Sequence, residues 1–117
     1  MMSRILSLSV MVSGLMLLSS VVEAESIVLQ VSIRGDESAR ATKVVRAKQG
    51  DHVAIEWSTD RPVTVHIHPY EIEQELTPGA RSRSEFIADI SGRFPIEAHF
   101  ASRAGKRIVA YLEVLPR

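Results

Sequence analysis

Apolar and polar residues alternate one for one along short segments of this chain, and turn residues separate the segments. In one segment, Val53, Ile55 and Trp57 alternate with Ala54 and Glu56. Successive side chains of a strand point to opposite faces of its sheet, so a period of two predicts half-buried strands. No segment keeps a helical period, so the pattern predicts an all-β fold, a β-sandwich of about seven strands. The strand candidates are residues 27–33, 43–47, 53–57, 63–68, 85–90, 94–98 and 107–115.

The first 24 residues have the pattern of a secretory signal peptide. Arg4 supplies a positive start, residues 5–22 are mainly apolar with interspersed serines, and Val22 and Ala24 place small residues where a signal peptidase reads them. We therefore expect cleavage after Ala24, a single domain of residues 25–117, and a periplasmic or secreted protein without a stable membrane anchor. The alternative is an uncleaved anchor, which the serines disfavour because they dilute the apolar run.

Composition excludes several classes of function. The chain has no Cys, so it has neither a disulfide nor a lipid attachment site, and all four Met residues lie within the first 24 positions. Lys and Arg total 14, as do Asp and Glu, and this balance gives no reason to expect a nucleic-acid partner. The chain shows no nucleophile-elbow motif and no Gly-rich phosphate loop, so we expect a protein that is not an enzyme.

Three stretches occur in an order that resembles the cupredoxin-like family. They are QGDHVAIEWSTDRPVTVHIHPY, LTPGARSRSEFIADISGRFPIEAHF and the closing RIVAYLEVLPR. The resemblance covers about residues 43–116, and it rests on the order and spacing of motifs that are individually common. It implies a Greek-key β-sandwich and, for many members of the family, copper.

The sequence departs from that family at the copper ligands. A blue-copper site uses two His, a Cys thiolate and a weak axial ligand that is often Met. Alignment through the family motifs places the Cys position at or near Ala98 and the first His position near Val63. We therefore expect no electron-transfer copper site of that type.

Three histidines form a different candidate site. His66 and His68 have the same parity in one strand, so both should point away from the core, about 6–7 Å apart. His99 follows a core-facing position in a later strand and should also point outward. Three imidazoles suit Cu(II) or Zn(II), and the additional candidate ligands are Glu71 and Glu97. The same histidines also fit a purely structural or solvated role on a strand surface.

Two functional hypotheses follow. The first is an exported cupredoxin-like protein that binds a metal ion, most readily copper with zinc as the second choice, and serves periplasmic metal handling. The second is a β-sandwich without a cofactor that acts as a binding or accessory domain for another exported protein. His52, next to a predicted turn, is expected to be a turn residue and not a ligand.

Expression of the whole chain in a host that exports proteins tests the predicted cleavage. We expect the recovered protein to have the mass of residues 25–117, measured by intact-mass spectrometry. Ala24→Leu is the matched variant, since a large residue at that position should block processing. Recovery of the full-length mass from the membrane fraction of the unmutated protein would instead support the anchor.

Overall fold

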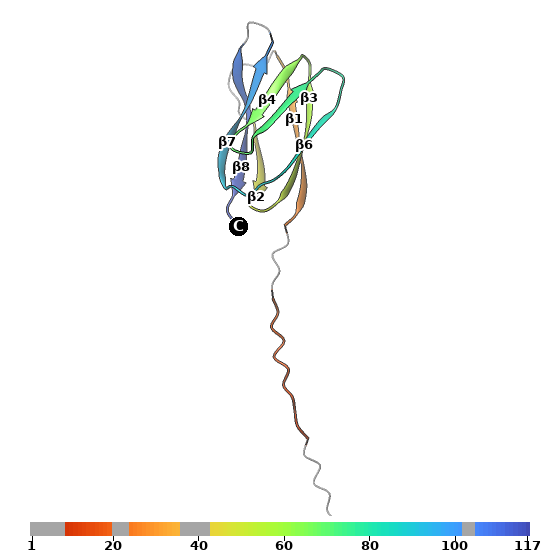
Figure 1. Cartoon of the computed structure of the whole chain (residues 1–117), viewed down its shortest axis with the longest axis vertical. Coiled ribbons are helices and arrows are strands. Elements are labelled where there is room, and N and C mark those ends of the chain that lie inside the picture. Colours follow the sequence, from red (N-terminus) through yellow and green to blue (C-terminus); the bar gives the residue numbers. More distant parts are fainter. Residues whose placement is uncertain (1–8, 20–23, 36–42, 102–104) are drawn as a thin grey trace, which may run out of the picture.

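The computed structural model describes residues 9–19, 24–35, 43–101 and 105–117, and within them eight strands form a two-layered β-sandwich (Figure 1). The three-stranded sheet has the order β1-β3-β6, and the five-stranded sheet has the order β2-β8-β7-β4-β5. This confirms the predicted all-β class. The strands are β1 (Ser26–Ile33), β2 (Val44–Lys48), β3 (His52–Thr59), β4 (Val63–Ile67), β5 (Ile72–Leu76), β6 (Ser82–Ile87), β7 (Gly92–Phe100) and β8 (Lys106–Leu115).

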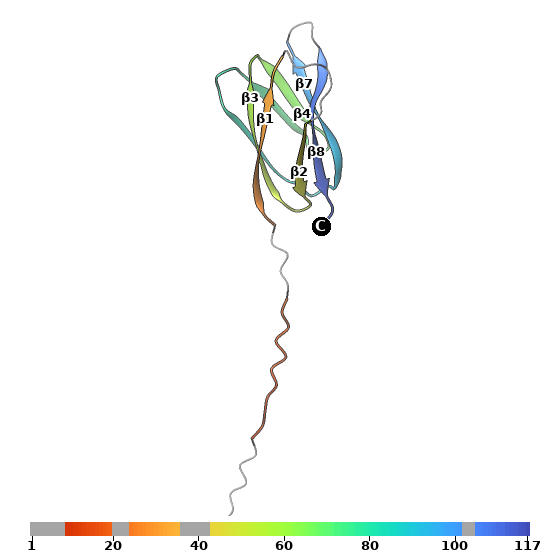
Figure 2. The same cartoon turned by 180° about the vertical axis from the view of Figure 1, so that it is seen from behind.

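Strands that follow one another in sequence often lie in different sheets. β1 pairs in parallel with β3, and β2 pairs in parallel with β8, whereas β3–β6, β4–β5, β4–β7 and β7–β8 are antiparallel. The chain therefore crosses between the layers several times. These crossings bring β7, from late in the chain, beside β4 in the middle of the larger sheet (Figure 2).

The core contains the apolar residues that the alternation assigns to it. In β3, Val53, Ile55 and Trp57 are all buried, and in β4 the inward residues Val65 and Ile67 have no exposed surface. Inward residues of both sheets form one continuous apolar cluster. Burial of these side chains is the main favourable contribution to folding, at about 1.5–3 kcal/mol for each large residue.

One polar contact crosses this core between the layers. The indole Nε1 of Trp57 donates a hydrogen bond of 2.9 Å to the hydroxyl of Ser84, and that hydroxyl donates to the side-chain oxygen of Gln74. Trp57 and Ser84 belong to the smaller sheet, while Gln74 lies on β5 of the larger one. The contact satisfies a buried donor that would otherwise carry a desolvation cost.

Two parts of the sandwich differ from the sequence prediction. β5 is not among the predicted strands, because its residues IEQEL include three polar side chains and give only a weak apolar signal. The strand predicted at 85–90 lies earlier, at Ser82–Ile87, where polar residues alternate with Ser84 and Phe86 on the inward side. The polar segment 36–42 and residues 102–104 of the predicted 101–106 loop lie outside the described residues.

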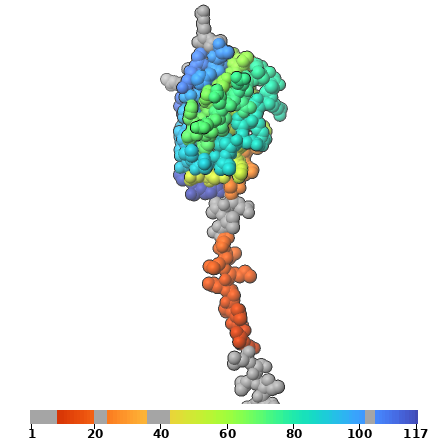
Figure 3. All heavy atoms as spheres, viewed as in Figure 1, coloured from red at the N-terminus to blue at the C-terminus, as the bar shows by residue number. Residues whose placement is uncertain are grey.

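Residues 9–19 run away from the sandwich as an exposed, extended segment (Figures 1 and 3). All strands and all buried apolar residues of the described chain lie between positions 26 and 115. Among the residues that the structure describes, no helix is long and apolar enough to span a bilayer.

We expect Ser84→Ala to lower the free energy of unfolding by about 1–3 kcal/mol, because the buried Trp57 N–H would lose its acceptor. Urea denaturation followed by Trp57 fluorescence measures the change. Ser82→Ala, two positions away on the same strand, is the control and should change stability by less than about 0.5 kcal/mol. Equal effects of the two substitutions would contradict a special role for the interlayer contact.

Candidate metal centre

The central histidine of the candidate site is fixed by the strand that carries it. β4 has the burial pattern of alternating inward and outward residues, and the inward positions Val65 and Ile67 leave His66 on the outer face of the larger sheet. His66 is paired in register with Glu73 on β5 and with Glu97 on β7. A single outward position therefore has a carboxylate on each neighbouring strand.

The structure brings the three predicted histidines together around His66. The ring centres of His66 and His99 are 4.8 Å apart and those of His66 and His68 are 5.9 Å apart. His99 reaches His66 diagonally, because its own register partner on β4 is Thr64. His68 is exposed and follows the last residue of β4. The predicted strand included His68, whereas the structure places it in the turn after β4.

These distances are compatible with one shared ion after side-chain rotation. Two imidazole nitrogens that bind one ion at about 2.1 Å place their ring centres roughly 5 Å apart. The His66 and His68 rings are nearly parallel, with an interplanar angle of 10°, so their in-plane lone pairs do not converge. Accordingly, the described side chains include no group of three His, Cys, Asp or Glu already arranged to hold a metal.

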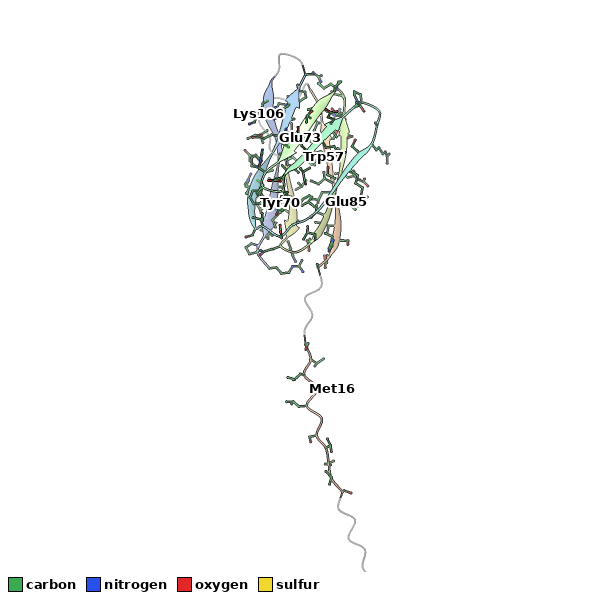
Figure 4. All side chains as sticks on the ribbon, in the orientation of Figure 1. Met16, Trp57, Tyr70, Glu73, Glu85 and Lys106 are labelled. Carbon is green, nitrogen blue, oxygen red and sulfur yellow. The ribbon has the colours of Figure 1, made fainter. Side chains whose placement is uncertain are left out.

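The carboxylate nearest to the cluster differs from the two expected ones. Glu73 Oε1 lies 3.6 Å from His66 Nε2, and Glu73 is largely exposed. Glu97 is instead paired with Lys106 at 3.1 Å, while Glu71 lies in the turn before β5. Figure 4 labels Glu73 and Lys106 on the upper part of the domain. The sequence does not indicate Glu73 as a ligand, because its register with His66 depends on β5, which the alternation does not predict.

Tyr70, close in sequence to the histidines, belongs to the packing and not to the cluster. Its hydroxyl donates a 2.6 Å hydrogen bond to the carbonyl of Ile90, and its ring packs against Phe86 and Phe94. Burial raises the pKa of the Tyr70 phenol. The backbone N–H of Ile90, which donates a 3.3 Å hydrogen bond to the phenol oxygen, lowers that pKa less, and the negative charge of Asp89 adds to the rise. A neutral phenol held in this way anchors the turn that carries His68.

His52 lies on the other sheet, at the start of β3, and takes no part in the cluster. Its backbone N–H donates to the carbonyl of Glu25 at 2.8 Å. It therefore serves as a histidine of the same chain that is remote from the candidate site, which makes it a useful control.

The two residues at or near which the family resemblance implies copper ligands belong to the apolar core. Ala98 has no exposed surface, and Val63 is 4% exposed and packs in the same cluster. The sequence contains no Cys that could supply a thiolate. The residues present therefore do not fit a type 1 copper site.

Comparisons with known proteins agree with the architecture. No family model matches the chain, and no curated protein matches it significantly. Among solved structures, a multi-copper oxidase from Pseudomonas thermotolerans is similar with a TM-score of 0.55 and 19% identity over 79% of this chain and 30% of that chain. The fold is cupredoxin-like.

Two further structures with this cupredoxin-like fold are similar at the same level. The copper nitrite reductase from Nitrosomonas europaea has a TM-score of 0.53 and 18% identity, over 78% of this chain and 42% of that one. A heme-copper terminal oxidase dimer has a TM-score of 0.54 and 19% identity, over 78% of this chain and 64% of that one. The chain thus spans less than two thirds of each of these proteins. At such identities the likeness concerns the fold alone.

Proposed function

We propose that this cupredoxin-like domain binds a divalent transition-metal ion, Cu(II) in preference to Zn(II), at His66, His68 and His99 with Glu73 as a fourth ligand. The observation that supports this is the proximity of three imidazoles, from β4, its following turn and β7, with the rings of His68 and His99 each within 6 Å of the ring of His66. Imidazole and carboxylate ligands suit both ions, and Cu(II) is bound more tightly than Zn(II) by most such sites.

The surroundings of the cluster favour metal handling over catalysis. The histidines lie on the outer face of a sheet, where a substrate would have little enclosure, and an exposed ion can pass readily to or from another molecule. The green segment that contains β4 and β5 lies on the face turned toward the viewer in Figure 3. Together with the predicted export, this supports sequestration or delivery of the ion in the periplasm. Two of the similar structures are a copper nitrite reductase and a multi-copper oxidase, which is a further reason to test copper first.

The alternative role is a metal-free domain that binds another exported protein. It is supported by the outer face of the smaller sheet, where Val28 is 54% exposed and Ile87 is 51% exposed. These apolar side chains border a shallow groove of about 400 Å³ that also includes Ala54. If the domain does not bind copper, this surface is its candidate binding site for another protein.

Calorimetric titration of the metal-free domain with Cu(II) tests the proposal. We expect saturable one-to-one binding that His66→Ala/His99→Ala weakens by at least about 100-fold, because the double substitution removes the central imidazole and one neighbour. His52→Ala is the matched control and should retain the affinity of the unmutated protein. The copper complex should lack the intense blue thiolate absorption, since no sulfur ligand is present. Equal binding by all three proteins would refute the site.

A second titration distinguishes the carboxylates. Glu73→Gln should weaken Cu(II) binding by roughly 10-fold, because the amide retains the size but loses the charge of the nearest carboxylate. Glu71→Gln, in the turn, should change the affinity by less than about twofold. The reverse order of effects would assign the fourth ligand to the turn and not to β5.

A further inference from the structure

The domain has one buried carboxylate that the metal proposal does not use. Asp51, in the turn between β2 and β3, is 3% exposed, and Ser84 is the only other buried polar residue in the described part of the chain. A buried charge is costly unless hydrogen bonds and counter-charges surround it. The hydrogen-bond donors around Asp51 therefore show which groups compensate its buried charge.

The carboxylate of Asp51 joins three segments that are distant in sequence. Its Oδ2 accepts a 2.9 Å hydrogen bond from the backbone N–H of Lys48, at the end of β2. Its Oδ1 accepts a 2.5 Å hydrogen bond from the guanidinium of Arg117 and a longer one, 3.4 Å, from the backbone nitrogen of Glu25. Figures 1 and 2 place the C-terminus and the start of β1 at this same end of the sandwich.

The nitrogen of Glu25 is the atom that the predicted processing would change. Hydrolysis of the peptide bond between Ala24 and Glu25 by a signal peptidase consumes one water, which adds its hydroxyl to the carbonyl carbon of Ala24. The nitrogen of Glu25 keeps its own hydrogen, receives the remaining proton of the water and takes up one more proton from solvent, while the new carboxyl group of Ala24 releases one. An amide with one N–H thereby becomes an ammonium group with three donors and a positive charge.

We propose that Asp51 is the binding site for the α-ammonium group of the processed chain, so that removal of residues 1–24 adds an ion pair to the folded domain. The inference goes beyond metal binding and rests on cleavage after Ala24. A charged donor forms shorter and stronger hydrogen bonds to a carboxylate than a neutral amide does. A carboxylate oxygen has two lone pairs, so Oδ1 can accept from both Arg117 and the ammonium group.

The backbone around Glu25 holds the nitrogen in place. The carbonyl of Glu25 accepts a 2.8 Å hydrogen bond from the N–H of His52, next to Asp51, and Ser26 continues into β1 in register with His52. A chain that began one residue earlier would move its amino group about 3.8 Å along the backbone, away from the carboxylate. The site therefore discriminates between neighbouring positions of the amino terminus.

Three versions of the domain test the proposal by thermal unfolding. They begin at Glu25 with a free amino group, at Glu25 with an acetylated one, and at Ala24 with a free amino group. At pH 6 we expect the first to unfold about 4–8 °C higher than the other two. Equal midpoints of all three proteins would overturn the proposal.

The pH dependence gives a readout that a merely structural contact would not produce. The pair with Asp51 should raise the pKa of the ammonium group above its ordinary range of about 7.7–8.0. Its contribution is then fully present below that range and is lost as the pH rises through the higher folded-state pKa. The advantage over the acetylated protein should disappear by about pH 10, and an advantage that persists there would contradict an ion pair.

The acetylated protein controls for the other charges at this end of the domain, since it shares them with the protein that begins at Glu25 with a free amino group. Those groups are Arg117, Lys48, His52, Asp89 and the side-chain carboxylate of Glu25. In an Asp51→Asn background the difference between free and acetylated forms should vanish at pH 6. A difference that survives that substitution would mean that the ammonium group pairs with another residue. If the Asn variant does not fold, the pH series on the unmutated protein tests the ion pair instead.

Discussion

Burial of the inward faces of two sheets is the constraint on which the other features of this domain depend. Because side chains alternate along a strand, the burial of Val65 and Ile67 fixes His66 on the outer face. A shift of register by one residue would exchange the two sets and place imidazole in the core. The position of the candidate ligands is thus a consequence of hydrophobic packing and does not depend on any contact that the histidines make themselves.

The same alternation explains why much of the fold could be predicted from the sequence. Val53, Ile55 and Trp57 identify a central strand because a half-buried strand requires that spacing, and the structure buries all three. β5 could not be predicted in the same way, since it lies at the edge of its sheet and has only two apolar residues, Ile72 and Leu76. An edge strand packs one face and pairs on one side, so it needs fewer apolar residues.

The candidate site was predictable in part for the same reason. Parity places His66 and His99 outward, but only the pairing of β4 with β7 brings them within ring contact. Glu73 requires a second pairing, between β4 and β5, that no local pattern reveals. Asp51 shows the limit most clearly, because its contacts with Glu25 and Arg117 span 26 and 66 positions. Such contacts follow from the topology and not from the residues near the turn.

This domain has a cupredoxin-like fold, but the apolar residues Val63 and Ala98 stand at or near the positions where the family resemblance implies copper ligands. In this domain those two positions strengthen the core, and a charged metal centre there would have to be compensated within an apolar environment. Ligands on the outer face avoid that requirement, since water already solvates them before an ion arrives. The sheet then fixes the backbone positions of His66 and His99, and a shared ion requires the nearly parallel rings of His66 and His68 to rotate. A site of this kind gives up some rigidity, which lowers its affinity relative to a preorganised interior site but also lowers the barrier to releasing the ion. That balance would suit the proposed handling of a metal ion better than a catalytic cycle through which the ion must be held.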